Sequence, residues 1–351
     1  MKISDVVVTP VAFPDPPLLN SAGVHQPWAL RQIVEIHAEG YVGLGETYGD
    51  LDLSAAAQLV GQDVFAALSL DGLKLRAVCE TALLDLQGKA LGRPVYDLLG
   101  GKVRDRIPFA GYLFYKWEGS DDYGPAVDPA GIVAQARLMV RRYGFGSLKL
   151  KGGVFPPDEE IAAIHALREA FPEHPLRLDP NCAWTVPTSL AVAERTAGLL
   201  EYLEDPTPGI AGMAEVAAAA PMPLATNMCV VSFADIPPAF ARRAVGVVLA
   251  DHHFWGGLRA TQRLAGICET YGVGLSMHSN SHLGISLAAM VQVAAATPQL
   301  AYASDTHTPW QLGVDVVTAP LSIVDGAVAV PDGPGLGVEL DPEIVARYRV
   351  A

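Results

Sequence analysis

Three short apolar segments of this sequence each end in a side chain with a hard oxygen atom. These side chains are Asp179, Glu204 and Asn227. Pro180 follows the first of them and cannot donate a ladder hydrogen bond, so a central strand should stop there. Any one of the three could simply cap a turn. Because three successive strand ends carry such groups, the pattern favours one shared site for Mg²⁺, which prefers oxygen ligands.

Two lysines, Lys149 and Lys151, end the apolar segment that precedes these three. Side chains alternate along a strand, so residues two apart point the same way. Two neighbouring ammonium groups should depress each other's pKa, which would prepare one of them to act as a base. A solvated pair at a strand edge is the alternative. The position beside the three oxygen ligands favours the catalytic interpretation.

After Asn227, the next two apolar segments along the chain each end in histidines. These histidines stand in Asp251-His252-His253 and in His278 to His282. A histidine that transfers protons usually needs a carboxylate to hold its tautomer, and Asp251 could serve His278 in this way. We expect His252, His253 and His282 to be structural or to support that pair.

A last apolar segment ends in Asp305-Thr306-His307. Both titratable residues of this group could contact substrate hydroxyls, or they could link to His278. The sequence alone leaves these two roles open.

Short apolar segments alternate with helical stretches from residue 107 onward, at a spacing that leaves room for a helix between each pair. Eight candidate strands are 109–115, 147–151, 176–179, 200–204, 223–227, 246–251, 274–279 and 301–307. This pattern predicts an α/β fold with a (β/α)8 TIM barrel, whose active site forms at the carboxyl ends of the strands. An open doubly wound sheet stays possible on the pattern alone.

The flanking regions have a different character. Residues 1–105 predict an α+β capping domain, with strands at 5–11 and 31–38, a lid loop at 14–28 and helix over 54–99. Residues 106–312 form the predicted barrel. Residues 313–351 return to glycine-rich strand sequence, and we expect them to pack back on the capping domain.

Composition sets broad limits on partners and location. The 351 residues carry a net charge of −14, which disfavours nucleic acid and anionic membranes as partners. No apolar segment approaches the roughly 18 residues of a membrane span, and the first residues do not resemble a signal peptide. The four cysteines form no CxxC pair, which disfavours a structural zinc site or a disulfide framework. We therefore expect a cytoplasmic protein.

The motifs, taken together and in order, resemble those of the D-glucarate dehydratase subgroup of the enolase superfamily, of the mandelate racemase and muconate lactonizing enzyme type. The barrel motifs are KLKGG, LDPNCAW, LEDP, TNM, DHHFWGG, MHSNSHLGIS and SDTHTPWQ; the lid motifs are PLLNSAGVHQPW and GLGETYGD; the tail motif is PGLGVEL. The resemblance covers almost the whole chain. It implies a modified, enolase-like barrel whose capping domain is completed by the C-terminal segment.

The resemblance also implies roles for individual residues. Asp179, Glu204 and Asn227 would bind Mg²⁺, which would hold a substrate carboxylate. Lys151, supported by Lys149, would stand on one face of the adjacent carbon. His278, paired with Asp251, would stand on the other. Substrate contacts are implied for His25, Tyr112, Phe114, Asn181, Asn280, Asp305 and His307.

The chain departs from the subgroup's pattern at two places. A glutamate that follows the EDP motif in the subgroup has no counterpart here, where Gly209 and Ile210 stand, so the second metal position falls to Glu204. The sequence ends at Ala351, shortly after Arg349, without the long C-terminal extension of the glucarate enzymes. This second difference disfavours glucarate itself as the substrate and leaves the proton chemistry unchanged.

The resulting hypothesis is a Mg²⁺-dependent lyase. It would remove the proton α to a carboxylate of an acid sugar and eliminate water, giving a 2-keto-3-deoxy sugar acid. A racemase or epimerase is an alternative, since bases on both faces permit inversion. A zinc hydrolase would usually need an HxH motif at the first barrel strand, which FAGYLFYKW does not contain. A barrel that binds a sugar acid without turnover is the non-enzymatic alternative. We expect the enzyme to bind a small-molecule acid sugar. We also expect the protein to form a homo-oligomer.

Overall fold

The computed structural model describes residues 1–49, 51–119 and 121–350. The chain begins with an antiparallel sheet in the order β1-β4-β5, formed by β1 (Asp5–Pro14), β4 (Trp28–Ala38) and β5 (Tyr41–Tyr48). Helix α1 (Leu73–Leu91) packs on β5 at close range. A Cβ atom at Gly43 would lie 2.0 Å from the carbonyl oxygen of Ala82 in α1, so only glycine permits this approach.

The predicted lid loop at 14–28 contains a short hairpin of β2 (Leu19–Asn20) and β3 (Gly23–Val24). The region predicted as helix over 54–99 is divided into a 3-10 helix, η1 (Ser54–Leu59), then α1 and the short α2 (Val95–Leu98). The hairpin rests on the barrel, because Leu19 N donates to the carbonyl oxygen of Tyr115 at 2.8 Å. The lid therefore lies over the strand ends in this structure.

A parallel seven-stranded sheet forms the barrel, in the order β13-β12-β11-β10-β9-β8-β7. Its strands are β7 (Gly111–Phe114), β8 (Leu148–Lys151), β9 (Leu176–Asp179), β10 (Leu200–Glu204), β11 (Leu224–Thr226), β12 (Val247–Ala250) and β13 (Gly274–Met277). Most of these strands are buried along their whole length, as in parallel sheets covered on both faces. Each coincides with one of the predicted segments.

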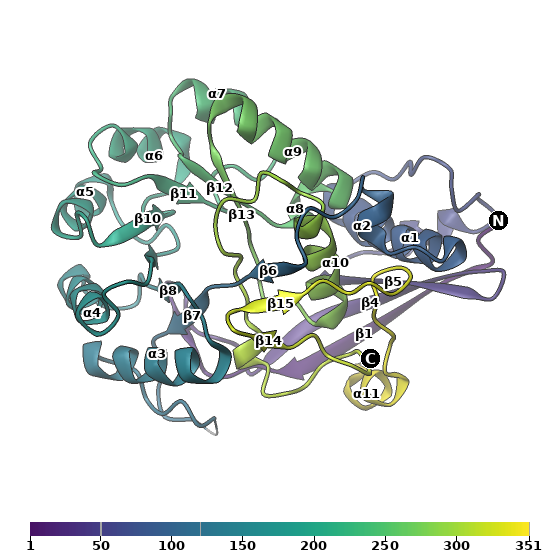
Figure 1. The fold of residues 1–351 in the computed structure, drawn as a ribbon, viewed down its shortest axis with the longest axis horizontal. Helices are drawn as coiled ribbons and strands as arrows, with labels where there is room; N and C mark the ends of the chain where they lie inside the picture. The colour runs from purple at the N-terminus through teal and green to yellow at the C-terminus, as the bar shows by residue number, and fades with distance from the viewer. Residues whose placement is uncertain (50, 120, 351) are drawn as a thin grey trace.

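Helices connect successive strands and lie on the outside of the curled sheet (Figure 1). They are α3 (Pro129–Tyr143), α4 (Pro157–Ala170), α5 (Val186–Arg195), α6 (Gly209–Ala217), α7 (Ile236–Ala241), α8 (His252–Trp255), α9 (Leu258–Tyr271) and α10 (Gly284–Ala295). The alternation of strand and helix predicted from the sequence is thus present.

The prediction of an eighth strand at 301–307 is wrong. Within this segment only Ser304 forms a bridge, to Phe109, and a second isolated bridge joins the preceding Leu300 to Leu275. The 3-10 helix η2 (Thr308–Trp310) follows the segment. Asp305 N donates to Met277 O at 2.9 Å, and Ala110 N donates to Ser304 O at 2.9 Å. The segment therefore joins both edges of the sheet without a continuous ladder, and it closes the barrel as irregular chain.

The C-terminal segment returns to the start of the molecule. Strands β14 (Ile323–Val324) and β15 (Ala327–Ala329) pair with β6 (Arg106–Pro108), and α11 (Pro342–Tyr348) ends beside β1 (Figure 1). Val350 N donates to Pro10 O at 3.1 Å. The tail therefore contacts both β1 and the segment at 106–108. The division of the chain after residues 105 and 312 stays a prediction.

None of the helices within the described ranges combines the length and apolar character that crossing a bilayer requires.

Candidate active site

A cavity of about 320 Å³ lies where the carboxyl ends of the barrel strands meet the lid. The predicted site residues that line it are His25, Tyr112, Phe114, Lys151, Asn181, Asn227, His278, Asn280 and His307. Its wall also contains residues that sequence reasoning did not single out, namely Asn20, Met228, Phe254 and Ser279. The structure thus brings together, around one cavity, side chains from positions 20 to 307.

The other predicted residues lie below or behind this wall. Lys149 is fully buried, and its Nζ atom is surrounded by three carboxylates: Glu204 Oε2 at 2.6 Å, Asp305 Oδ2 at 2.8 Å and Asp179 Oδ2 at 3.5 Å. Asp305 pairs with Lys149 and is not among the residues that line the cavity, and its predicted substrate contact stays a prediction. This arrangement gives Asp305 a part in holding the lysine.

The predicted mutual depression of the two lysines' pKa values is wrong for Lys149. Burial alone would lower the pKa of its ammonium group, but the nearby carboxylates of Asp305 and Glu204 outweigh burial and raise that pKa well above its ordinary value. The acidic groups that enclose Lys149 come from distant strand ends and dominate its electrostatics.

Lys151 reaches into the cavity beside the first predicted metal ligand. Its Nζ atom donates to Asp179 Oδ2 at 2.6 Å and to Asn181 Oδ1 at 2.8 Å. Burial opposes ionisation of Asp179, but Lys151 and Lys149 outweigh burial and hold the pKa of that carboxyl at about 2. The hydroxyl of Tyr112 also donates to Asp179 Oδ2, at 3.2 Å. Asp179 is therefore an anion fixed between two strands.

Three buried oxygen atoms of the predicted metal ligands lack a hydrogen-bond partner among the described residues. They are Glu204 Oε1, Glu204 Oε2 and Asn227 Oδ1. Of these, Glu204 Oε2 forms an ion pair with Lys149, and the other two have no partner of either kind. Burial and the surrounding carboxylates raise the pKa of Glu204 well above its ordinary value despite Lys149. Unpartnered buried oxygens normally have a ligand, water or ion, so this set fits a cation.

Asp205 is a functional candidate that sequence reasoning missed. Its Oδ1 atom accepts a hydrogen bond from Thr226 Oγ1 at 2.5 Å, and its Oδ2 atom accepts from the backbone N–H of Asn227 at 2.7 Å and of Met228 at 3.1 Å. Its backbone φ of 37° is unusual for a residue other than glycine. Asp205 therefore fixes the turn that presents Asn227 to the cavity. The LEDP motif contains it, but nothing in that motif separates its role from that of Glu204.

The histidine side of the cavity contains the predicted pair. His278 Nδ1 lies 3.0 Å from Asp251 Oδ2, so the Nδ1–H group donates to the carboxylate and leaves Nε2 for the cavity. Burial opposes ionisation of Asp251, but His253 and hydrogen bonds from His253 and His278 hold the pKa of its carboxyl well below the ordinary value. The pairing inferred from the sequence is present in the structure.

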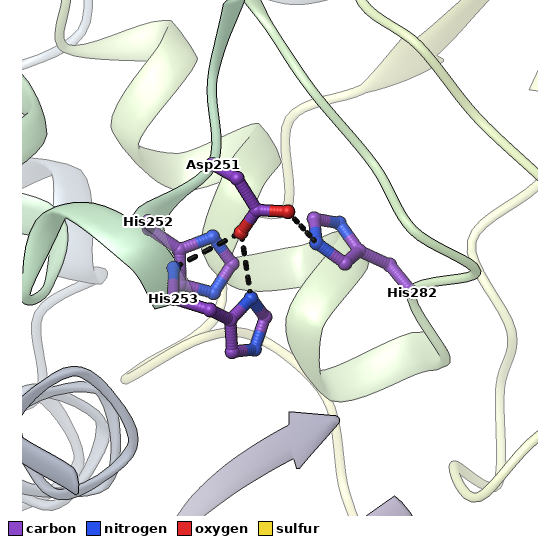
Figure 2. A group of neighbouring side chains, drawn as sticks. All are labelled: Asp251, His252, His253 and His282. Atoms are coloured by element: carbon purple, nitrogen blue, oxygen red, sulfur yellow. Dashed lines mark hydrogen bonds and ion pairs between the residues drawn. The ribbon is translucent and has the colours of Figure 1, made fainter. Parts of the chain in front are cut away.

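Asp251 also lies among three further histidines, His252, His253 and His282 (Figure 2). One possible ligand atom from each of these four residues falls within 4.8 Å of the others, a donor set that a zinc ion could use. The carboxylate, however, already accepts four hydrogen bonds, from His278, from the hydroxyl of Tyr48 and from the backbone and Nδ1 of His253. A metal there would have to displace these donors, so we interpret the cluster as a hydrogen-bonded support for Asp251.

His25 and His307 lie on the lid side of the cavity. His25 Nδ1 is 3.2 Å from Asp15 Oδ2. His307 Nδ1 accepts a hydrogen bond from Ser281 N at 3.1 Å, and burial together with His25, His278 and the lysines lowers the pKa of His307 well below its ordinary value. His307 is therefore neutral with its proton on Nε2. It can donate one hydrogen bond to a ligand.

Tyr48 is the second missed residue. It lies within the lid motif GLGETYGD, which indicated a match to the lid without assigning a role to this side chain. Its contact with Asp251 joins residues 203 positions apart. The pattern of apolar and polar residues around Tyr48 or around Asp251 does not indicate a contact between two segments so far apart in the sequence.

Comparisons with protein families, known sequences and solved structures all point to enolase-type enzymes. The family described as enolase C-terminal domain-like matches residues 131–344. A protein of Streptomyces coelicolor named probable glucarate dehydratase is 55% identical over 99% of this chain and 90% of the relative. A crystal structure of an enolase from Thermobispora bispora, complexed with magnesium and formate, is 59% identical with a TM-score of 0.95, covering 99% of this chain and 92% of that one.

A third relative, an enolase from Pseudomonas fluorescens with bound magnesium, potassium and tartrate, is 47% identical with a TM-score of 0.93 and covers 99% of this chain and 92% of that one.

Proposed function

The chain belongs to the enolase C-terminal domain-like family of the enolase superfamily, and from this premise we propose that it is a Mg²⁺-dependent hydro-lyase of acid sugars. It would remove the proton α to a carboxylate and eliminate the β-hydroxyl as water, leaving a 2-keto-3-deoxy acid. One observation carries the proposal: Lys151, His278 and the oxygen ligand Asn227 line the same cavity.

The residues present fit a magnesium ion. Asp179, Glu204 and Asn227 would hold it through oxygen atoms, the ligands that Mg²⁺ prefers. Two of these oxygens, on Glu204 and Asn227, are buried without a partner in the described part of the chain. When bound, Mg²⁺ supplies positive charge beside the substrate carboxylate, which makes the adjacent carbon more acidic. Two relatives with 59% and 47% identity are named as complexes with magnesium.

The lysine side of the cavity would hold the substrate carboxylate and one face of the α-carbon. Lys149 is locked by carboxylates, so it would act as fixed positive charge under the site. Lys151 faces the cavity and contacts Asp179 and Asn181. Once deprotonated, its amine could take the α-proton. An amine close to two hydrogen-bond acceptors is held in one orientation, which favours reaction in a single geometry.

The histidine side would complete the elimination. His278 donates through Nδ1 to Asp251 and presents Nε2 to the cavity. Protonated at Nε2, His278 can give that proton to the departing β-hydroxyl, which leaves as water with the electron pair of its bond to carbon. If the α-proton lies on its own face, His278 can first take that proton and then return it to the leaving group.

An acid sugar is the substrate class that agrees with the cavity. Amide and imidazole groups at Asn20, His25, Asn181, Asn280 and His307 can bind several hydroxyls. The Streptomyces relative is named probable glucarate dehydratase, and the two crystal structures are named as complexes with carboxylates, formate and tartrate.

A racemase or epimerase is the second candidate. It is favoured by one observation, that two side chains able to transfer protons, Lys151 and His278, line a single cavity. If both reach the same carbon, a proton removed from one face can return on the other.

A screen of acid sugars with Mg²⁺ tests the proposal. The purified protein is incubated with aldonic and aldaric acids in D₂O, and the reaction is followed by proton NMR and by a 2-keto acid assay. We expect loss of the α-proton with formation of a keto product. Inversion with deuterium incorporation and no keto acid would replace the dehydratase by the epimerase. Binding without exchange or product would contradict both.

A further inference from the structure

Tyr48, at the end of β5, contacts the histidine side of the site from the capping domain. We propose that Tyr48 is a positioning residue for the general acid–base histidine and acts on His278 through Asp251. The proposal rests on the proposed function for the role of His278. The contact itself is a property of the fold.

The two donors share one oxygen atom. The hydroxyl of Tyr48 donates to Asp251 Oδ2 at 2.7 Å, and His278 Nδ1 donates to the same oxygen at 3.0 Å. A carboxylate only accepts hydrogen bonds, so the tyrosine must be the donor. Burial and the charge of Asp251 raise the pKa of Tyr48 well above its ordinary value, and the hydroxyl therefore keeps its proton.

The other oxygen of Asp251 is held independently. Oδ1 accepts from the backbone N–H of His253 at 3.0 Å and from His253 Nδ1 at 2.8 Å. With two donors on each oxygen, rotation of the carboxylate would break several hydrogen bonds. This arrangement fixes the direction of the Nδ1–H bond of His278. It thereby fixes where Nε2 points.

The ring of Tyr48 is held by contacts that do not need its hydroxyl. Its centroid lies 4.3 Å from that of His253 and 5.7 Å from that of His282, and the guanidinium carbon of Arg31 lies 5.2 Å from it. Removal of the hydroxyl alone should therefore leave the ring in place. Tyr48→Phe is a specific test of the hydrogen bond.

The hydroxyl of Tyr48 has a second contact at the cavity wall. It accepts a hydrogen bond from the backbone N–H of Asn280 at 3.1 Å, and the side chain of Asn280 lines the cavity. The Tyr48 hydroxyl therefore holds both the carboxylate of Asp251 and the backbone at Asn280, two residues after His278. Tyr48→Phe would remove both hydrogen bonds.

Strand β5 reinforces this connection at a second point. The carbonyl oxygen of Glu46 lies 2.9 Å from His253 Nε2, on the histidine whose other nitrogen binds Asp251. The histidine side thus takes its alignment from two residues of one capping strand. Lys149 and Lys151, in contrast, pair with residues of the barrel.

The first experiment compares Tyr48→Phe with Tyr41→Phe in the full chain with saturating Mg²⁺. Tyr41 lies on the same strand but is 41% exposed and should tolerate the change. We expect Tyr48→Phe to lower kcat by about tenfold to hundredfold, the factor associated with a hydrogen bond to a charged group, with KM within about twofold. Equal kcat values in both variants would overturn the proposal, as would equal changes in kcat and KM.

A double-mutant cycle then tests whether the effect passes through Asp251. In an Asp251→Asn background, Tyr48→Phe should have little further effect on kcat, whereas in a Lys151→Ala background it should keep its full factor. Equal factors in both backgrounds would contradict action through Asp251.

A spectroscopic readout separates this proposal from the proposed function. The Nδ1–H proton of the His278 pair should give a downfield NMR signal that is lost in His278→Asn and Asp251→Asn. We expect Tyr48→Phe to shift this signal and Tyr41→Phe to leave it unchanged. An unshifted signal in Tyr48→Phe overturns the proposal even if the enzyme is active. A shifted signal supports it even if no acid sugar is turned over, an outcome that would count against the proposed function alone.

Discussion

The two sides of the cavity are built in different ways. The lysine side consists of ion pairs between residues of β8, β9, β10 and the closing segment, all in the barrel. The histidine side depends on strand β5, which lies outside the barrel sheet, because Tyr48 contacts Asp251 and the carbonyl of Glu46 contacts His253. One side is built from ion pairs between lysines and carboxylates, and the other from hydrogen bonds that converge on a single carboxylate.

Because they are built differently, the lysine side and the histidine side need different things in order to function. The lysine side places three buried carboxylates around Lys149, and the Mg²⁺ ion that we propose would balance their charge. The histidine side needs alignment, and it obtains that from a strand far away in the sequence. Changes to metal binding and changes to capping-strand contacts should therefore affect different measured quantities.

The largest expected effect is on turnover. His278→Asn and Lys151→Ala should each lower kcat by about 10²- to 10⁴-fold, the usual contribution of general acid–base catalysis. Steady-state kinetics with an active acid sugar measures this, and thermal melting shows whether the fold survives. His165→Asn, an exposed histidine in α4, is the matched control. Wild-type rates in both variants would mean that neither residue transfers the proton.

A stability effect should appear at the capping strand. Glu46 is 1% exposed, and its carboxylate accepts from the backbone N–H of Leu283 at 2.9 Å and of Ser286 at 3.0 Å, at the start of α10. Glu46→Ala leaves these donors unpaired and should lower the free energy of unfolding by about 2 to 4 kcal/mol. Urea denaturation measures it, with exposed Glu215→Ala as the control. Equal midpoints for the two variants would show that this strand does not anchor α10.

The metal side should respond to its supporting carboxylate. Asp205→Asn disturbs the turn that presents Asn227, and changes next to metal ligands typically weaken metal affinity by about 10- to 100-fold. Isothermal titration with Mg²⁺ gives the affinity directly, without turnover. Asp158→Asn, which replaces an exposed carboxylate, should bind like the wild type. Unchanged affinity in Asp205→Asn would place the metal elsewhere.

The smallest expected effect concerns a substrate contact. Asn280 lines the cavity, and Asn280→Ala would remove a neutral side-chain hydrogen bond while keeping the backbone N–H that contacts Tyr48. KM should rise by about two- to tenfold with kcat nearly unchanged. If kcat fell by a larger factor than KM rose, Asn280 would belong to the catalytic group.

The sequence predicted the site best where a functional residue directly follows a strand, because both can then be recognised from a few neighbouring residues. Polar residues directly after short apolar segments placed Asp179, Glu204, Asn227 and His278 at strand ends, because the carboxyl ends of parallel strands converge. The pairing of Asp251 with His278 followed from adjacent strand ends in the same way. The resemblance to a family supplied the lid contact His25 and the aromatic residues Tyr112 and Phe114.

The rest depended on contacts between distant segments. Tyr48 and Asp251 are separated by 203 positions, and the carboxylates around Lys149 come from strands whose positions no local pattern gives. The eighth strand was predicted from its apolar residues, yet only two isolated bridges form there, at Leu300 and Ser304. Asp205 was hidden beside Glu204, since adjacent acidic residues in a strand end point in different directions and only the structure separates them.

The central claim is that the two sides converge on the carbon next to a substrate carboxylate. Proton NMR of an acid sugar in D₂O, with Mg²⁺ and the wild-type enzyme, tests this most directly. We predict that the α-proton signal disappears together with formation of a 2-keto-3-deoxy acid, and that His278→Asn and Lys151→Ala slow this reaction. An α-proton that persists across the whole panel of sugars, with Mg²⁺ bound to the enzyme, would contradict the account.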